Sequence, residues 1–214
     1  MNMHWTRKWQ CQQIAKEIVD ILNDKGYIAY YAEDCDEAKA KVLEIVPEGA
    51  SIAMGGSVTL GDMGLVDIFR SDKYRFYDRY SAGSYENTYK VYRESMMADW
   101  LVTGSNAVTR EGEIVNTDSS GNRAGAMIFG PDKVLIVVGA NKVVDDLPAA
   151  FKRIKEIAPM NAKRIGHQTP CAVSGKCENC ETPQSICNAT SIIHNGRKHP
   201  GRFTVIVIAE DVGF

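Results

Sequence analysis

Four of the cysteines lie within a single stretch of the chain, TPCAVSGKCENCETPQSICN, at residues 169–188. Thiolates are ligands of zinc and of iron–sulfur clusters, and four unliganded thiols so close together would be open to oxidation. We therefore expect the stretch to hold a metal, within a loop at residues 167–190. Cys11 and Cys35 stand alone in helical patterns and are expected to be inert. The four expected ligands are Cys171, Cys177, Cys180 and Cys187, spaced C-x5-C-x2-C-x6-C.

The cysteine spacing leaves the identity of the metal open. A structural zinc site usually contains two C-x2-C pairs, and this stretch contains only one. One such pair with two more distant cysteines also occurs at iron–sulfur clusters, although the C-x2-C-x2-C run of ferredoxins is missing. Zinc and a [4Fe–4S] cluster are therefore comparable on spacing alone. Disulfides rank third, because thiols stay reduced in the cytoplasm.

A glycine-rich stretch, MGGSVTLGDMG, follows a predicted strand and opens a predicted helix at residues 54–64. Gly55 and Gly56 would let backbone N–H groups approach an anion, and Ser57 and Thr59 would add hydroxyls. The stretch is neither a P-loop nor a G-x-G-x-x-G motif. A tight strand–helix turn with a Ser or Thr cap explains it as well as an anion site does.

A second polar stretch, NTDSSGNRAG, is expected to form a loop at residues 116–125. Asp118 offers a carboxylate that could act as an acid or base, Asn122 offers an amide, and Arg123 suits a carboxylate or phosphate partner. Asn141 and Lys142 follow the strongest predicted strand, so Lys142 would place a cation at a strand end. The alternatives are a solvated connection for the loop and a solvated surface charge for Lys142.

Strands and helices alternate through most of the chain, which predicts an α/β protein with an open, mainly parallel, Rossmann-like sheet and helices on both faces. KVLIVVG at 133–139 lacks alternation, as expected for a strand that is covered on both faces. Two β-prone runs around Glu111 and Gly112 predict a small hairpin at 107–118. Ligands bind at the carboxyl ends of parallel strands, which selects the loops 55–64, 104–106, 116–125 and 139–144.

The remaining elements are predicted from apolar periodicity and from capping residues. Strands are expected at 27–31, 51–55, 74–78, 100–104 and 203–210. Helices are expected to end near Gly26, to run from Asp34 or Asp36 to Val46, to include Leu65 to Phe69, to span 86–98, and to begin after Asp145 or Asp146.

The bulk properties are those of a globular protein. The chain has 214 residues, of which 44% are hydrophobic and 24% charged, and a single domain over 1–214 is expected. The net charge of −2 gives no general electrostatic case for nucleic acid. The first residues are charged throughout, which does not suit a signal peptide, and no apolar run predicts a membrane span. We therefore expect a cytoplasmic protein.

Three stretches taken together resemble the lactate-utilisation (LUD) domain proteins, of the kind called lactate utilization protein C. They cover 53–67, 115–155 and 169–188. The cysteine loop resembles only a subset of the family, since other members lack it. The most specific part contains Asp118, Gly121-Asn122-Arg123, Gly130-Pro131 and Gly139-x-Asn141-Lys142.

The resemblance implies a fold like that of the NagB, ribose-5-phosphate isomerase and CoA-transferase group. It also implies a bacterial protein with a link to the oxidation of L-lactate to pyruvate, alongside iron–sulfur partner proteins. That partnership favours a [4Fe–4S] cluster over zinc.

Three functions are open at this point. The first is a redox accessory protein, with a small carboxylate near the 55–59 and 118–123 segments and a cluster that relays electrons. The second is an enzyme for a phosphorylated or CoA-linked small acid, with Ser57 and Thr59 on one anion, Asp118 as acid or base, and Arg123 or Lys142 on a second negative group. The third is a non-catalytic regulatory protein with structural zinc. The aromatic-rich segment 74–92 could serve a homodimer, although core packing explains it equally well.

Overall fold

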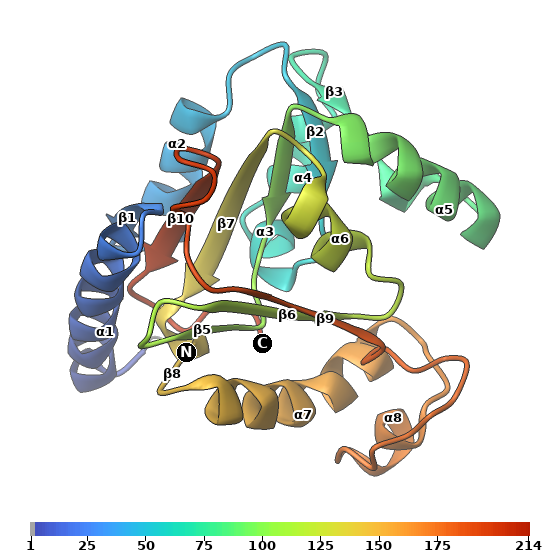
Figure 1. The fold of residues 1–214 in the computed structure, drawn as a ribbon. Coiled ribbons are helices and arrows are strands. Elements are labelled where there is room, and N and C mark those ends of the chain that lie inside the picture. The colour runs from blue at the N-terminus through green and yellow to red at the C-terminus, as the bar shows by residue number, and fades with distance from the viewer. Residues whose placement is uncertain (1–2) are drawn as a thin grey trace.

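The computed structural model describes residues 3–214, which contain two β-sheets (Figure 1). The large sheet has six strands in the order β1-β10-β7-β4-β2-β3, and every pairing in it is parallel. The predicted open, Rossmann-like sheet is thereby confirmed. Its strands are β1 (Ile28–Ala32), β2 (Ser51–Met54), β3 (Arg75–Phe76), β4 (Trp100–Thr103), β7 (Lys133–Gly139) and β10 (Phe203–Ile208).

Helices cover both faces of the large sheet, as predicted. One face packs against α1 (Trp5–Asp24) and α6 (Asn122–Phe129), and the other packs against α2 (Cys35–Ile45), α3 (Val58–Asp62) and α4 (Leu65–Phe69). The central strand β7 contributes Val134, Ile136 and Val138 to the first core and Leu135 and Val137 to the second. Its unbroken apolar run therefore reflects burial on both sides.

The predicted hairpin is confirmed, and it forms the centre of the small sheet. Strands β5 (Ala107–Thr109) and β6 (Ile114–Asp118) pair antiparallel around Gly112, whose φ of 81° suits glycine. Two strands absent from the prediction extend this sheet, β8 (Val143–Val144) beside β5 and β9 (Ala189–Ile193) beside β6. The result is a four-stranded sheet rather than an isolated hairpin.

The small sheet lies between the large sheet and α7 (Leu147–Arg164), as Figure 1 shows. Alternate residues of the hairpin face opposite ways, since Val108 and Ile114 join the core against the large sheet. Their neighbours Ala107 and Val115 pack against Ala150 and Ile154 of α7. This arrangement places α7 across the carboxyl ends of the parallel strands.

The prediction of a loop over 116–125 was wrong. Asn116 to Asp118 end β6, and Asn122 already begins α6, so only residues 119–121 connect two regular elements. Helix α6 follows Gly121 in the left-handed region and has no capping side chain at that position. Instead, the Asp118 carboxylate accepts a hydrogen bond from the backbone N–H of Ala124 at 2.6 Å. A cap from the preceding strand leaves no local sequence signal.

The other elements are short or peripheral. The helix predicted at 86–98 is α5 (Tyr85–Glu94) followed by a single 3₁₀ turn, η2 (Ser95–Met97). Helix α5 buries none of its residues and lies at the outer edge of the molecule (Figure 1). The remaining short helices are η1 (Arg79–Ser81), η3 (Ala140–Lys142) and α8 (Pro170–Ser174). Within residues 3–214, no helix combines the length and the apolar character needed to cross a bilayer.

Candidate functional site

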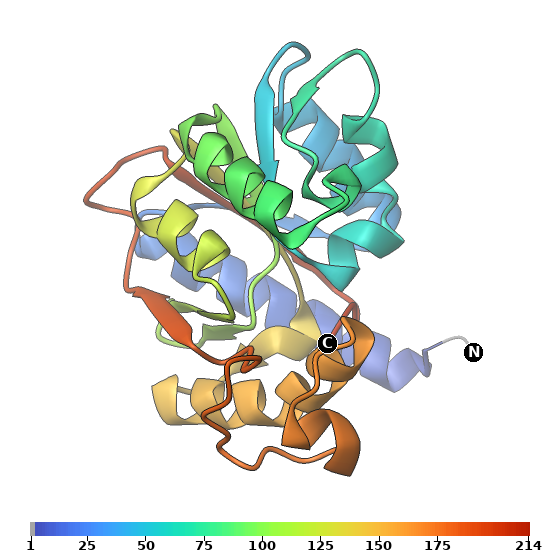
Figure 2. The same cartoon turned by 90° about the vertical axis from the view of Figure 1, so that its right-hand side faces the viewer.

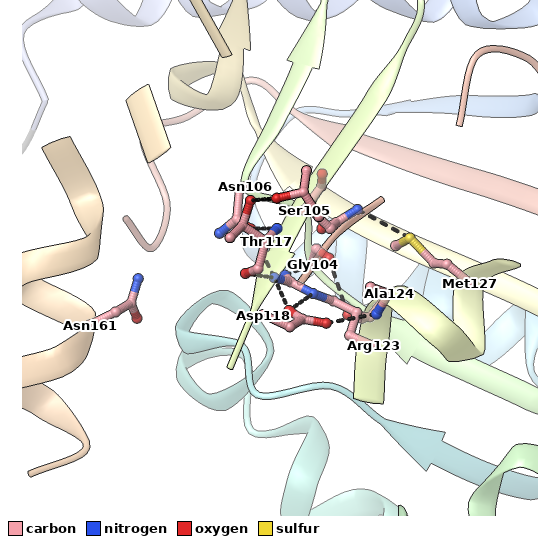
Figure 3. Close-up of polar contacts among 12 residues, drawn as sticks. Gly104, Ser105, Asn106, Thr117, Asp118, Arg123, Ala124, Met127 and Asn161 are labelled. Carbon is pink, nitrogen blue, oxygen red and sulfur yellow. Dashed lines mark hydrogen bonds and ion pairs between the residues drawn. The ribbon is translucent and has the colours of Figure 1, made fainter. Parts of the chain in front are cut away.

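The chain passes from the large sheet to the small one through Gly104, Ser105 and Asn106, and Arg123 of α6 binds this corner (Figure 3). Arg123 Nη2 donates to Asn106 Oδ1 at 2.8 Å and to the carbonyl of Thr117 at 3.1 Å. The same Asn106 oxygen accepts from the Thr117 N–H at 2.8 Å. Arg123 therefore joins α6, β6 and the corner after β4 in one network.

Asp118 completes this network. One oxygen, Oδ1, accepts from Arg123 Nε at 3.0 Å and from Nη2 at 2.6 Å, while Oδ2 accepts from Ala124 N–H. The two side chains are only 10% and 8% exposed, so this is a buried ion pair. Both carboxylate oxygens are thus already occupied by donors of the protein. Such an arrangement positions Arg123 at the corner between the two sheets.

Lys142 lies at the end of β7 in a very different environment. It is 4% exposed, and its ammonium donates one hydrogen bond, to Thr59 Oγ1 at 3.0 Å. Within residues 3–214 it has no carboxylate partner. Burial, followed by the nearby charges of Arg153 and Arg123, lowers the pKa of Lys142 from 10.5 to about 8. A buried ammonium without a carboxylate partner is typical of a site that binds an anion.

A cleft connects these two regions under α7. Its inner part, about 30 Å³, is lined by Ser57, Gly104 and Lys142. Its outer part, about 150 Å³, is lined by Asp118 and Asn122 and, from the cysteine loop, by Ile186 and Cys187. Gly56, Asn106, Arg123 and Asn161 line both parts. Among residues 3–214, the charged side chains of the lining are four cations, Arg79, Arg123, Lys142 and Arg164, and one carboxylate, Asp118. On a chain with a net charge of −2, this is a local basic site.

Not all of the predicted site residues reach the cleft. Gly56, Ser57, Asp118, Asn122, Arg123 and Lys142 line it. Gly55 lies behind it, where a Cβ would be 2.4 Å from Thr103 Oγ1, so glycine is required for the strand to pass. Thr59 lies beside the cleft, where its hydroxyl accepts the hydrogen bond from Lys142. The Asn141 side chain instead accepts a hydrogen bond from the Val212 N–H at 3.2 Å.

Ser57 caps α3, as one of the two alternatives for this stretch predicted. Its hydroxyl accepts from the Leu60 N–H at 3.3 Å. Ser57 also lines the inner part of the cleft beside Gly104, where a Cβ would lie 2.8 Å from Ser57 Oγ. The tight packing of this turn thus sets the wall of the inner pocket.

Sequence reasoning missed several residues of the cleft. Arg79 follows β3, Asn106 lies between β4 and β5, and Asn161 and Arg164 lie near the end of α7. Asn161 stands across from the Arg123 network in Figure 3. These residues come from three separate parts of the chain, and none belongs to a local motif. Only the packing of α7 over the strand ends brings them together.

The four loop cysteines line one cavity of about 330 Å³ beside the cleft. Phe151 and Ile154 of α7 and Ile186 of the loop supply apolar walls. Helix α8, which contains Cys171, packs beside α7 in Figure 2. All six cysteines are free thiols. The loop is held to β6, because the Asn188 N–H donates to the Asp118 carbonyl at 3.0 Å and Ser119 Oγ donates to the Ser185 carbonyl at 3.2 Å.

The thiols line one cavity but do not form a complete metal-ion site. Burial, and then the charges of Cys177, Cys171 and Cys180, raises the pKa of Cys187 to about 11. Over residues 3–214 no three His, Cys, Asp or Glu side chains converge on one metal-ion position. The cavity lining is mixed, with Lys155 and Glu181 beside the apolar residues. Four cysteines are a donor set that suits zinc and an iron–sulfur cluster equally.

The parallel sheet defines a Rossmann-like α/β protein, and the basic cleft lies at the strand ends, where proteins of that class bind their ligands. The family model of the LUD domain matches residues 15–208. The chain belongs to the LUD domain family of lactate-utilisation proteins.

Solved structures give a likeness of fold. A crystal structure of a DUF162 family protein from Deinococcus radiodurans is similar over 92% of this chain and 98% of that chain, with 15% identity and a TM-score of 0.53. A crystal structure of eIF2B delta from Chaetomium thermophilum matches 65% of this chain and 54% of that one, with 12% identity and a TM-score of 0.33. The comparison with curated proteins gives no match.

Proposed function

We propose that this chain is a redox accessory component of L-lactate oxidation, which binds a small organic acid in its basic cleft and carries a [4Fe–4S] cluster in its cysteine loop. The observation that carries the proposal is the contact between the two cavities. Ile186 and Cys187 line both the cysteine cavity and the outer part of the cleft. A bound acid and a cluster would therefore be neighbours, and membership of the LUD domain family supports the link to lactate.

Cys171, Cys177, Cys180 and Cys187 would hold the cluster, and a bound cluster supplies one-electron transfer. Oxidation of L-lactate to pyruvate releases two electrons and two protons, whereas a [4Fe–4S] cluster carries one electron at a time. We therefore assign the removal of hydrogen from lactate to a partner protein. This chain would pass the two electrons on singly, with iron–sulfur proteins as donor and acceptor. The free thiols fit the reducing cytoplasm that we propose as its location.

In the cleft, the protein's own side chains bind and orient the acid. Lys142 would supply the charge that holds a carboxylate, since among residues 3–214 its ammonium has only the Thr59 hydroxyl as a partner. Asp118 would act on Arg123 rather than on the ligand, because both of its oxygens already accept hydrogen bonds. The polar corner at Asn106 would then present a fixed wall to the bound acid.

The test is anaerobic purification with measurement of iron, sulfide, zinc and the visible spectrum. We expect about four irons per chain and broad visible absorbance, both lost in Cys177→Ser/Cys180→Ser. The matched control is Cys35→Ser, a thiol at the start of α2 whose pKa is raised by burial. It should keep the iron. One zinc per chain without colour would overturn the cluster and favour a regulatory protein with a structural metal.

A second candidate function is favoured by Lys142 itself. A pKa near 8 leaves a useful fraction of neutral amine at physiological pH, which suits a group that transfers protons or attacks a carbonyl. In that case the chain would be an enzyme for a phosphorylated or CoA-linked small acid. Loss of turnover in Lys142→Met with retained binding of the acid would favour this enzyme over the accessory role.

A further inference from the structure

The inner end of the cleft has room for one small charged group. Its volume of about 30 Å³ is roughly twice what a single water requires, which suits a carboxylate. Glycines keep it open, since a Cβ on Gly104 would lie 2.8 Å from Ser57 Oγ and one on Gly56 would lie 3.0 Å from Arg79 Nη1. Lys142 is the only side chain of this pocket with an unpaired charge among residues 3–214, because Arg123 is neutralised by Asp118.

The outer end of the cleft has two further unpaired cations. Arg79 stacks over the ring of Tyr80 at 5.4 Å and over that of Tyr92 at 5.0 Å, so aromatic contacts rather than a carboxylate hold it in place. Arg164 comes from the opposite wall, at the end of α7, and donates to Asn161 Oδ1 at 3.3 Å. Neither arginine forms an ion pair within the described part of the chain. Both lie near Tyr80: burial raises the pKa of this tyrosine, and the charges of the two arginines oppose that rise.

The cleft therefore has two separate positive ends with a neutralised pair, Asp118 and Arg123, between them. A monocarboxylate at Lys142 would leave Arg79 and Arg164 without a counter-charge. We propose that the preferred ligand is an organic acid with two anionic groups, a carboxylate at Lys142 and a phosphate or second carboxylate between Arg79 and Arg164. This inference rests on the proposed acid-binding role of the cleft and narrows its substrate class. L-lactate would fill only the inner half.

The inference is tested by calorimetric titration of the anaerobically purified protein with three probes: L-lactate, succinate and 3-phosphoglycerate. We expect at least one of the two-anion probes to bind about tenfold more tightly than L-lactate, because charge-assisted hydrogen bonds at the arginines add to those at Lys142. Which of the two binds more tightly distinguishes a phosphate from a carboxylate at the outer end. In Arg79→Gln/Arg164→Gln this advantage should disappear while L-lactate binding changes less than about twofold.

Two variants separate the inner end from the outer one. Lys142→Met should weaken all three probes together, since each places its carboxylate there. Lys163→Gln, next to Arg164 but not part of the cleft lining, should change none of them. If L-lactate binds and neither two-anion probe binds more tightly, this inference fails and the acid-binding function stands. If none of the three acids binds, the acid-binding function fails and takes this inference with it.

Discussion

Two buried cations lie at the carboxyl edge of the large sheet, and they differ in how far the protein balances their charges. Arg123 has Asp118, Asn106 and two backbone carbonyls as acceptors, one of them distant at 3.5 Å. Among the described residues, Lys142 has a single acceptor, the Thr59 hydroxyl. Both were predicted to bind an anion, yet only Lys142 is left with a charge that the protein itself does not balance. Arg123 is thus balanced within the fold, whereas the charge of Lys142 is the one that we propose for binding a ligand anion.

The difference follows from what each cation costs in the folded state. A buried charge that is paired and fully hydrogen-bonded has its desolvation largely offset, whereas an unpaired one shifts its pKa towards the neutral form. Lys142 shows that shift, with a pKa of about 8. Burial of this one unpaired ammonium therefore destabilises the folded protein. A ligand anion that binds there would remove it, so ligand binding and stability should be coupled.

The largest effect is expected from breaking the paired region. Asp118→Ala removes the partner of a buried guanidinium and the acceptor of the Ala124 N–H at the start of α6. We expect a loss of about 3 to 5 kcal/mol in the free energy of unfolding, measured in denaturant. Asp145→Ala is the control, because this side chain is 86% exposed and pairs with Arg110 at 3.4 Å. Equal losses in the free energy of unfolding would show that the buried pair of Asp118 and Arg123 contributes no more stability than an exposed pair.

The next effect has the opposite sign and tests the unpaired region. A pKa lowered from 10.5 to about 8 corresponds to a penalty of about 3 kcal/mol while the amine is charged. Below pH 8 both folded and unfolded chains carry the proton and the penalty is complete. Between about pH 8 and 10.5 the folded chain has released the proton that the unfolded chain keeps, so stability rises with pH.

Lys142→Met should therefore be more stable than the native chain at pH 7, and the gap should close towards pH 10.5. Unfolding free energies of both proteins at pH 7 and pH 10 measure this. Lys163→Met, exposed on α7, is the matched control and should leave the stability unchanged. A native chain that is more stable than Lys142→Met at pH 7 in the absence of ligand would mean that Lys142 is neutralised after all.

The contrast between the two regions also explains how far the sequence could be interpreted. Elements with local signals were predicted well: β7 from its apolar run, and α2 and α7 from caps at Asp34 or Asp36 and at Asp145 or Asp146, which the structure places at Asp34 and Asp146. Helix α6 was missed because its N-terminus is capped by Asp118 from the preceding strand. Strand β9 was missed because its partner, β6, lies far away along the chain.

The site shows the same division. The sequence suggested Arg123 from a polar loop and Lys142 from a strand end, and contained nothing to show that one has a carboxylate partner and the other does not. That difference depends on which side chains the fold brings within hydrogen-bond distance. Arg79 and Arg164 could not be found at all, since they join the cleft only through the packing of η1 and α7. The cysteine loop was recognisable because its four cysteines lie within one short stretch.

The smallest effect concerns the one hydrogen bond that Lys142 makes. Thr59→Val keeps the shape of the side chain and removes the oxygen that accepts from Lys142 Nζ at 3.0 Å. We expect a loss of about 1 to 2 kcal/mol at pH 7, because the ammonium would be left buried without an acceptor among the described residues. In the Lys142→Met background the same change should cost much less, since only the weak contact of Thr59 Oγ1 with the Val212 carbonyl at 3.5 Å remains.

A double-mutant cycle measures this coupling between Thr59 and Lys142, and the coupling should also vanish at pH 10.5, where the amine is neutral. Additive effects at pH 7 would mean that Thr59 does not stabilise the charged form, and Lys142 would then have to be hydrated rather than held ready for an anion.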